Sequence, residues 1–354
     1  MKAAQRAQRL RDRFEELEVD AALLTAEPDA QYVSGFSGEG WVIVDEAVAI
    51  VTDGRYDLRA EREAPGCEII IRSGDIKEPV KSRLVEKGAK RVAFQADQMT
   101  VSAHAELAEQ LEGIELVPAK AILKDARMLK DEDEIDILRR AIAATDQALE
   151  AVVADLRLGM SEKEASLEVQ RQLLLAGGDK LSFPTIAAFG PNSADPHAEP
   201  SDRTLAEGDN VKLDFGAAIQ NYCADLTRTV FISGPDDKQR EIYNIVLDAQ
   251  LQATAACKPG AACKDVDGVA REIIKEAGYG DYFTHGLGHG VGLQIHEAPG
   301  LGHTSEDTLA AGMVVTIEPG IYIKEWGGVR IEDCVLITED GHEVLTKAAK
   351  LNLK

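Results

Sequence analysis

The sequence predicts an α/β domain over residues 1–125, followed by a larger α+β domain made of two similar halves. At roughly 150 residues per domain, a chain of 354 residues corresponds to about two domains. Helix-like and strand-like segments alternate through the first part of the chain. The second part repeats its own pattern about 100 residues later along the chain. We therefore expect a second domain over residues 126–354.

Composition and charge exclude several classes of protein. With 45% hydrophobic and 29% charged residues, the chain has the composition of a soluble folded protein. Its 62 acidic and 39 basic residues leave a formal charge of −23, which repels nucleic acid and anionic membranes. No apolar run approaches the ~18 residues of a membrane-spanning helix, and the N-terminal residues lack the apolar core of a signal peptide. The five scattered cysteines form no CxxC motif, so we expect reduced thiols and a cytoplasmic location.

The first domain is predicted from one helix and a series of short apolar strands. Leu10, Phe14 and Leu17 fall on one face of a helix. The strands are expected at Ala21–Leu24, Trp41–Val44, Val48–Val51 and Glu68–Ile71. Alternation of this kind is typical of an α/β domain.

A capped helix is expected to open the second domain. Asp131 is followed three residues later by Glu134, which is the pattern of a capping box. An amphipathic segment then runs to Gly159, where glycine favours a helix end. These features place the domain boundary between residues 120 and 130.

An internal repeat predicts the architecture of the second domain. The segment from Gly159 to Gly177 realigns onto residues 260–278, and Leu205–Asp214 realigns onto Leu309–Glu318. Two copies are too few for a solenoid, so we expect a compact pseudo-twofold α+β domain with helices on one side of a curved sheet. Each repeated strand ends in an acid, and a site between the halves would receive one acid from each.

Four acids are expected to converge at this site. Asp214 lies on the opposite face of its strand from Val211, Leu213 and Phe215, because side chains alternate along a strand. Asp225 follows in a second strand that can pair with the first as a hairpin. In the other half, Glu318 ends its strand, and Glu332 shares a strand face with Arg330. Mutual repulsion would force these carboxylates to take up protons unless cations neutralise them, so the pattern favours two divalent metal ions.

Histidines are concentrated in the same domain. The glycine-rich segment Thr284–Glu297 contains His285, His289 and His296. Its glycines allow the backbone and the imidazoles to approach a ligand closely. His197 precedes Asp214 at a spacing similar to that between His296 and Glu318, so these two histidines are candidate repeat partners.

Five motifs together resemble a known family. They are Leu213–Gly216, Asp225–Thr229, His285–His289, Ile317–Gly320 and Val329–Asp333. The combination resembles the proline-specific metallopeptidases of the pita-bread fold, namely Xaa-Pro dipeptidase (prolidase) and aminopeptidase P, and the first domain resembles the N-terminal domain of creatinase and prolidase. The resemblance implies that Asp225, His289, Glu318 and Glu332 hold one metal ion. It implies that Asp214, Asp225 and Glu332 hold the other.

The ligand set and the resemblance together indicate a mechanism. One imidazole among carboxylates favours Mn²⁺, with Co, Zn or Fe as further possibilities. We expect a hydroxide bridging the two metal ions to attack the Xaa-Pro bond of dipeptides or short peptides, with Glu318 carrying the proton to the leaving nitrogen. The resemblance assigns His197, His285 and His296 to oxyanion or substrate contacts. Tyr322 and Arg330 would line or brace the pocket, and Phe183 and Tyr222 are candidates for its apolar wall.

Several alternatives stay open at this point. Residues 298–307 contain no arginine to bind a substrate carboxylate, so dipeptidase and aminopeptidase activities are both compatible with the sequence. Methionine aminopeptidase shares the five-ligand pattern. A non-catalytic peptide-binding protein or a metal-free creatinase-like hydrolase could share the fold, although these usually lack the acids. The resemblance further implies a homodimer.

Overall fold

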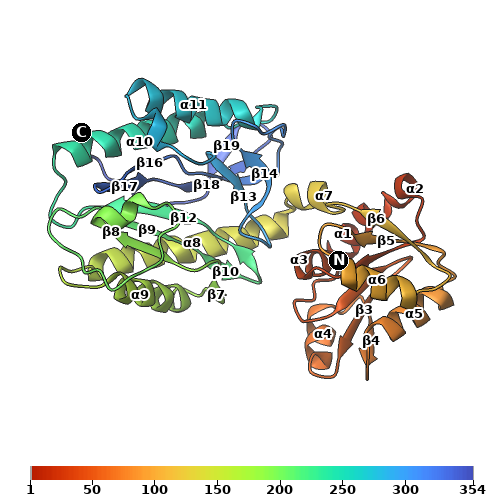
Figure 1. Cartoon of the computed structure of the whole chain (residues 1–354). Coiled ribbons are helices and arrows are strands. Elements are labelled where there is room, and N and C mark those ends of the chain that lie inside the picture. The colour runs from red at the N-terminus through yellow and green to blue at the C-terminus, as the bar shows by residue number, and fades with distance from the viewer. Residues whose placement is uncertain (1, 354) are drawn as a thin grey trace. The chain divides into compact units, whose positions relative to one another are not determined.

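The chain folds as two compact units. The computed structural model describes residues 2–353, and the first unit ends at Arg127 while the second begins at Met128 (Figure 1). The sequence-based division after residue 125 falls within the short helix α7, Lys124–Met128. Each unit has its own buried core, so each is described by itself.

A mixed six-stranded sheet forms the centre of the first unit. Its strands follow the order β4-β3-β2-β1-β5-β6, with antiparallel pairing around β2 and parallel pairing elsewhere. The apolar runs expected as strands coincide with the first four strands to within two residues. The bounds are β1 Ala21–Leu24, β2 Trp41–Val44, β3 Val48–Asp53, β4 Glu68–Arg72, β5 Arg91–Gln95 and β6 Glu115–Ala119.

Helices cover this sheet, and one differs from the sequence prediction. The expected helix through Leu10, Phe14 and Leu17 is broken by a turn, where Arg13 donates a hydrogen bond to the carbonyl of Ile122. Leu10 is therefore fully buried, whereas Phe14 and Leu17 are half-buried. The helices are α1 Lys2–Arg11, α2 Phe14–Leu17, α3 Glu27–Ser34, α4 Asp57–Glu63, α5 Lys77–Glu86, α6 Val101–Gln110 and α7.

The second unit opens with the expected capped helix. The Asp131 carboxylate accepts the Glu134 N–H, and the Glu134 carboxylate accepts the Asp131 N–H, which completes the capping box. The helix ends four residues earlier than expected, at Asp155, and Gly159 (φ +84°) lies in the turn that follows. The helices of this unit are α8 Glu132–Asp155, α9 Glu162–Leu175, α10 Asp237–Ala256 and α11 Cys263–Glu276.

The predicted pseudo-twofold repeat is present in three dimensions. Helices α9 and α11 correspond, and each begins after a glycine of positive φ whose N–H is bonded to the matching leucine carbonyl: Gly159 to Leu205, and Gly260 to Leu309. An isolated bridge joins Ser161 to Thr204 in one half and Ala262 to Thr308 in the other. Two halves with the same connections therefore build one unit.

The strands that carry the acids pair in equivalent ways. Strand β9 pairs with β12 in one half, and β15 pairs with β18 in the other, both antiparallel. This confirms the expected hairpin around Asp225. The strands are β7 Lys180–Leu181, β8 Ile186–Phe189, β9 Val211–Phe215, β10 Ala217–Ile219, β11 Tyr222–Cys223, β12 Leu226–Val230, β13 Gly288–Gly290, β14 Glu297–Leu301, β15 Val314–Ile317, β16 Gly320–Ile323, β17 Gly327–Arg330, β18 Asp333–Ile337 and β19 His342–Val344.

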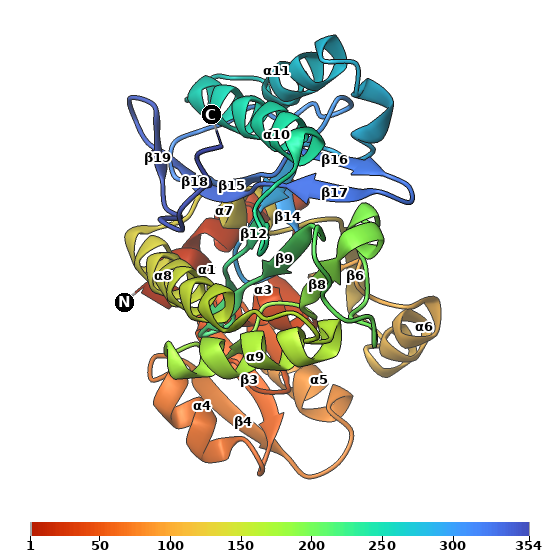
Figure 2. The ribbon, with the colours of Figure 1, turned by 90° about the vertical axis from the view of Figure 1, so that its left-hand side faces the viewer.

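The helices of the second unit lie outside its strands. Apolar side chains of α8 and α9 pack on β8, β9 and β12, and those of α10 and α11 pack on the strands of the other half. Figures 1 and 2 show the two helix pairs on opposite outer sides with the strands between them. The predicted fold class, an α/β unit followed by a pseudo-twofold α+β unit, is confirmed. Within residues 2–353, no helix combines the length and the apolar character needed to cross a membrane.

Ser161 caps α9, and its removal should destabilise the second unit. The Ser161 Oγ accepts the Glu164 N–H at 3.2 Å, and Glu164 accepts the Ser161 N–H at 2.8 Å. We expect Ser161→Ala to lower the free energy of unfolding by about 1 kcal/mol, because the first turn loses its side-chain acceptor. Urea unfolding followed by circular dichroism measures this. Ser161→Asp, which retains an acceptor, is the control, and an unchanged midpoint for Ser161→Ala would contradict the assignment.

Candidate metal centre

A cavity of about 490 Å³ in the second unit brings the predicted acids and histidines together. Both halves contribute to its wall, and several apolar side chains flank the charged ones. The lining residues are Phe183, Pro184, Thr185, Ile186, Pro196, His197, Ala198, Glu199, Pro200, Asp214, Asp225, His285, Gly286, Gly288, His289, Ile295, His296, Glu318, Arg330 and Glu332. A cavity with an apolar wall and a polar floor can position an uncharged part of a substrate against reactive groups.

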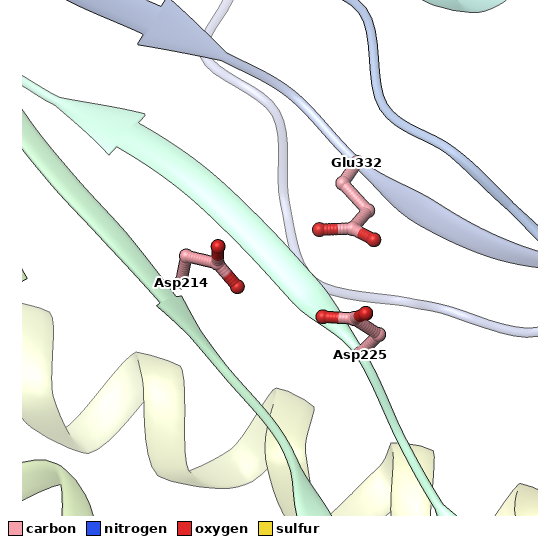
Figure 3. A group of neighbouring side chains, drawn as sticks. All are labelled: Asp214, Asp225 and Glu332. Carbon is pink, nitrogen blue, oxygen red and sulfur yellow. The ribbon is translucent and has the colours of Figure 1, made fainter. Parts of the chain in front are cut away.

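Three carboxylates that are distant in sequence lie closest together. Asp214 belongs to β9, Asp225 lies between β11 and β12, and Glu332 lies between β17 and β18. Each offers an oxygen atom within 4.8 Å of the others, and all three side chains are buried (Figure 3). The carboxylates point toward one another, as the repeat predicts.

The chemistry of these carboxylates suits a bound cation, because without one they repel each other. Asp214 Oδ1 and Glu332 Oε1 are buried without a hydrogen-bond partner. Burial, reinforced by repulsion from the neighbouring acids, raises the pKa of Asp225 and of Glu332 well above their ordinary values. Buried carboxylate oxygens with no donor are the ligands that hard divalent cations prefer. The residues present therefore suit a metal ion.

His289 faces the same group from β13. Its Nε2 lies 3.3 Å from Glu318 Oε1 and 3.6 Å from Asp225 Oδ2. Its Nδ1 lies 3.1 Å from the carbonyl of Gly290, and donation there leaves Nε2 to face the acids. Although burial opposes ionisation of both groups, their hydrogen bond raises the pKa of His289 and holds that of Glu318 down to about 2.

The glycines around His289 allow this close approach. A Cβ added at Gly288 would overlap the carbonyl of Thr316, and one at Gly290 would overlap that of Ala298. The His289 N–H is bonded to Thr316 Oγ1 at 3.0 Å, which sets the imidazole relative to β15. The glycines of this segment therefore permit close packing of the main chain as well as close approach of a ligand.

Arg330 neutralises part of the acidic charge. Its guanidinium is buried, pairs with Asp214 and donates to the Tyr322 hydroxyl at 2.8 Å and to Thr227 Oγ1 at 3.0 Å. Thr227 in turn donates to Glu332 Oε2 at 2.6 Å. Burial, helped by the nearby carboxylates of Glu318 and Asp214, raises the pKa of Tyr322 to about 12 although Arg330 opposes this, so the phenol keeps its proton. Arg330 and Tyr322 thus brace the acids, and Tyr322 lies behind the residues that line the cavity.

The main chain beside Glu332 is held by a second buried arginine. Arg228 donates to the carbonyl of Glu332 and to Asp333 Oδ1, the latter at 2.8 Å. It also donates to the carbonyls of Ala348 and Ala349 at 2.8 and 3.3 Å. Arg228 therefore links the segment around residue 348 to the main chain of Glu332, a candidate ligand.

The remaining histidines occupy different parts of the wall. His296 packs edge-to-face on His289, with ring centroids 4.4 Å apart, and burial lowers its pKa. His285 Nδ1 lies 2.7 Å from the Gly286 carbonyl, and its Nε2 lies 2.8 Å from the Tyr322 hydroxyl. Both ring nitrogens of His285 are thus paired within the protein, and because its side chain lines the cavity, its contact with substrate stays a prediction. His197 is exposed at the cavity wall.

The two candidates for the apolar wall differ in position. Phe183 lines the cavity, as expected. Tyr222 does not: its side chain is buried, and its hydroxyl donates to Glu134 Oε1 at 3.0 Å beneath α8. The alternation of side chains along a strand does not reveal that the tyrosine turns to a helix. Ile186 and Ile295 line the wall and were missed by the sequence analysis.

Three polar neighbours of the acids were also missed. Thr227, Lys212 and Thr316 each lie two residues from a predicted ligand, and Thr316 Oγ1 donates to Glu318 Oε1 at 3.1 Å. Since residues two apart share a strand face, the alternation that selects the acids also selects these residues.

Two family models match the chain. Residues 136–339 match metallopeptidase family M24, and residues 6–129 match the creatinase/prolidase N-terminal domain. Together they span both units, and the resemblance stated from the motifs is confirmed.

Individual relatives match over nearly the whole length. An Xaa-Pro dipeptidase of Pyrococcus furiosus is 39% identical over 98% of this chain and 99% of its own. The solved structure of an Xaa-Pro dipeptidase from Bacillus anthracis has a TM-score of 0.95 and 40% identity, covering 99% of both chains. That of an X-Pro aminopeptidase from Thermotoga maritima has a TM-score of 0.91 and 35% identity, covering 96% of this chain and 99% of the other.

The thermal stability of the metal-free protein should fall as pH rises. A carboxyl group whose pKa is raised by folding stabilises the fold below its unfolded pKa, and that contribution is lost as pH rises through the folded value. For Asp225 and Glu332 the loss begins above the ordinary values of 3.8 and 4.5. Glu318, with a pKa of about 2, does not titrate in this range. We therefore expect Mn²⁺ to raise the melting temperature more at pH 8 than at pH 5.

Differential scanning calorimetry of the chelated protein with and without Mn²⁺ measures this difference. Glu332→Gln is the control, because it removes one of the two repelling charges and should reduce the pH dependence. Equal Mn²⁺ shifts at both pH values would show that the buried acids do not hold the ion.

Proposed function

The chain belongs to metallopeptidase family M24, which makes it a metal-dependent hydrolase, and from this premise we propose that it hydrolyses the Xaa-Pro bond of dipeptides or short peptides. The observation that carries the proposal is the convergence of Asp214, Asp225 and Glu332 beside a cavity with an apolar wall. An Xaa-Pro bond has no N–H and a ring of fixed φ, so it requires shape and an apolar surface more than donors. Phe183, Ile186 and Ile295 supply such a surface.

We propose that this chain binds two divalent cations, with Mn²⁺ as the native ion. Asp214, Asp225 and Glu332 would hold one, and Asp225, His289, Glu318 and Glu332 the other. When bound, the cations lower the pKa of water so that it serves as a nucleophile, and they polarise the scissile carbonyl. A set of carboxylates with one imidazole supports manganese over zinc, with cobalt, zinc or iron as alternatives.

The surrounding side chains bind the peptide and move protons. Glu318 is the proposed proton carrier, since its carboxylate lies at the cavity wall and is ionised at neutral pH. His296 is the proposed donor to the developing oxyanion, and its lowered pKa keeps the ring neutral with one N–H. His197 faces the substrate. His285 holds Tyr322, and through it Arg330, in place.

The charged side chains that line the cavity affect which peptide lengths it can accept. Among the described residues that line it, Arg330 alone carries a permanent positive charge, and that charge is paired with Asp214. Glu199 adds a carboxyl group to the wall. A free carboxylate directly after proline therefore finds no side-chain cation on this wall. Peptides that continue beyond proline should be accepted at least as well as dipeptides.

Other readings are less well supported. A methionine aminopeptidase is not favoured, because an Xaa-Pro dipeptidase and an X-Pro aminopeptidase are among the relatives that match both units. A non-catalytic peptide-binding protein would not need three buried acids within 4.8 Å. A homodimer rests on the resemblance alone, and a cytoplasmic location rests on the sequence together with the free state of the five cysteines.

A comparison of four peptides tests the proposed activity. With Mn²⁺ we expect alanine to be released from Ala-Pro, Ala-Pro-amide and Ala-Pro-Ala, with kcat/KM for the amide and the tripeptide at least equal to that for Ala-Pro. Amino-acid analysis of the products measures the release. Met-Ala-Ser is the control for a methionine aminopeptidase and should stay intact. Cleavage of Met-Ala-Ser alone, or of none of the four, would refute the proposal.

His296 should act on the substrate and not on the metal. We expect His296→Ala to lower kcat by ~10²-fold, the scale of losing one oxyanion donor, while the metal content stays at the wild-type level. Steady-state kinetics and elemental analysis measure the two quantities. His303 lies in the same half and outside the cavity lining, so His303→Ala is the matched control. Loss of metal from His296→Ala would reassign the residue as a ligand.

A further inference from the structure

Lys212 is a buried lysine on the strand that carries Asp214. The two residues share a face of β9, and the Lys212 side chain is fully buried. Its Nζ donates to the carbonyl of Asp195 and, at 3.3 Å, to that of Pro196. It also lies 5.3 Å from the centroid of the Tyr322 ring. Burying a lysine side chain is costly, and these contacts with the loop and the ring offset the cost.

The carbonyls that Lys212 binds belong to the segment that carries His197. Pro196 has no N–H, so its carbonyl is the one main-chain group it can offer to a partner. Arg330 Nη1 donates to the same carbonyl at 3.2 Å. Two buried side chains, Lys212 and Arg330, therefore hold the residue directly before His197. His197 itself is exposed, and its N–H is bonded to Asp195 Oδ1 at 3.0 Å.

The internal repeat shows a similar contact in the other half of the second unit. Lys212 lies two residues before Asp214, and Thr316 lies two residues before Glu318 on the matching strand. Thr316 Oγ1 accepts the main-chain N–H of His289. In each half, the residue two positions before the acid thus contacts the main chain of a segment that carries a histidine.

We propose that Lys212 is a positioning residue that sets the place of His197 on the cavity wall. The inference rests on the proposed function, in which His197 faces the peptide. Loss of the Lys212 donors would leave the carbonyl of Asp195 with only the Ala198 N–H, at 3.4 Å, and that of Pro196 with Arg330 alone. His197 would then sample positions away from the substrate, while the acids keep their places on the strands.

A double-mutant cycle with His197 tests this. Lys212→Met removes the donors and keeps the length of the side chain. We expect it to lower kcat/KM for Ala-Pro-Ala by ~10-fold in the wild-type background and by less than ~2-fold in the His197→Ala background. Manganese content should stay unchanged in every variant. Lys264→Met, at an exposed position of α11, is the matched control.

Amide hydrogen exchange gives a readout independent of turnover. Lys212→Met should speed exchange in a peptide covering residues 195–200 and leave a peptide from α11 unchanged, whereas Lys212→Arg should restore slow exchange and activity. If Lys212→Met does not fold, Lys212→Gln, whose amide is too short to reach both carbonyls, takes its place in the cycle.

The results distinguish a positioning role of Lys212 from other roles. Equal losses in both backgrounds, loss of manganese, wild-type kinetics or unchanged exchange would each overturn the proposal. If the wild-type protein cleaves none of the peptides, the proposed function fails, and the exchange experiment still tests the positioning of the segment.

Discussion

Repulsion among buried carboxylates is the constraint on which the second unit depends. Asp214 lies on β9, whereas Asp225 and Glu332 lie between strands, and no apolar packing force would bring three such groups together. Their positions are imposed by strands of both halves, which pack on the two hydrophobic cores of the second unit. Arg330 offsets part of the charge, and the oxygens that find no donor are those that a cation can bind. The fold thus holds three carboxylates in mutual repulsion, which a bound cation would offset.

The two halves contribute different numbers of candidate ligands. The first half contributes Asp214 and Asp225, and the second contributes His289, Glu318 and Glu332. Hydrogen bonds then cross between the halves, as from Thr227 to Glu332 at 2.6 Å. Each half supplies only part of the candidate ligand set, so the candidate centre is present only when both halves have assembled. His289 lies in the second half, where Gly288 and Gly290 let its strand approach neighbouring main chain closely.

Much of this could be predicted from the sequence, because the repeat and the two-residue period of a strand are both local patterns. They select the strands of Asp214 and Glu318 and the hairpin of Asp225, and the capping box selects the start of α8. What escaped prediction depends on partners distant in sequence. Tyr222 turns to Glu134, and His285 pairs with Tyr322, because of packing between elements that no local pattern encodes. At the turn that breaks the first helix, Arg13 likewise bonds a distant group, the Ile122 carbonyl.

The contacts of Arg228 have a consequence for the order in which the centre can be completed. All the candidate ligands precede residue 333, yet the arginine that holds the Glu332 main chain also binds the carbonyls of Ala348 and Ala349. A ribosome-bound chain that ends before those residues has every ligand but lacks part of the frame around one of them. Synthesis from the N-terminus therefore makes every candidate ligand available before residues 348 and 349, which Arg228 joins to the Glu332 main chain, have emerged.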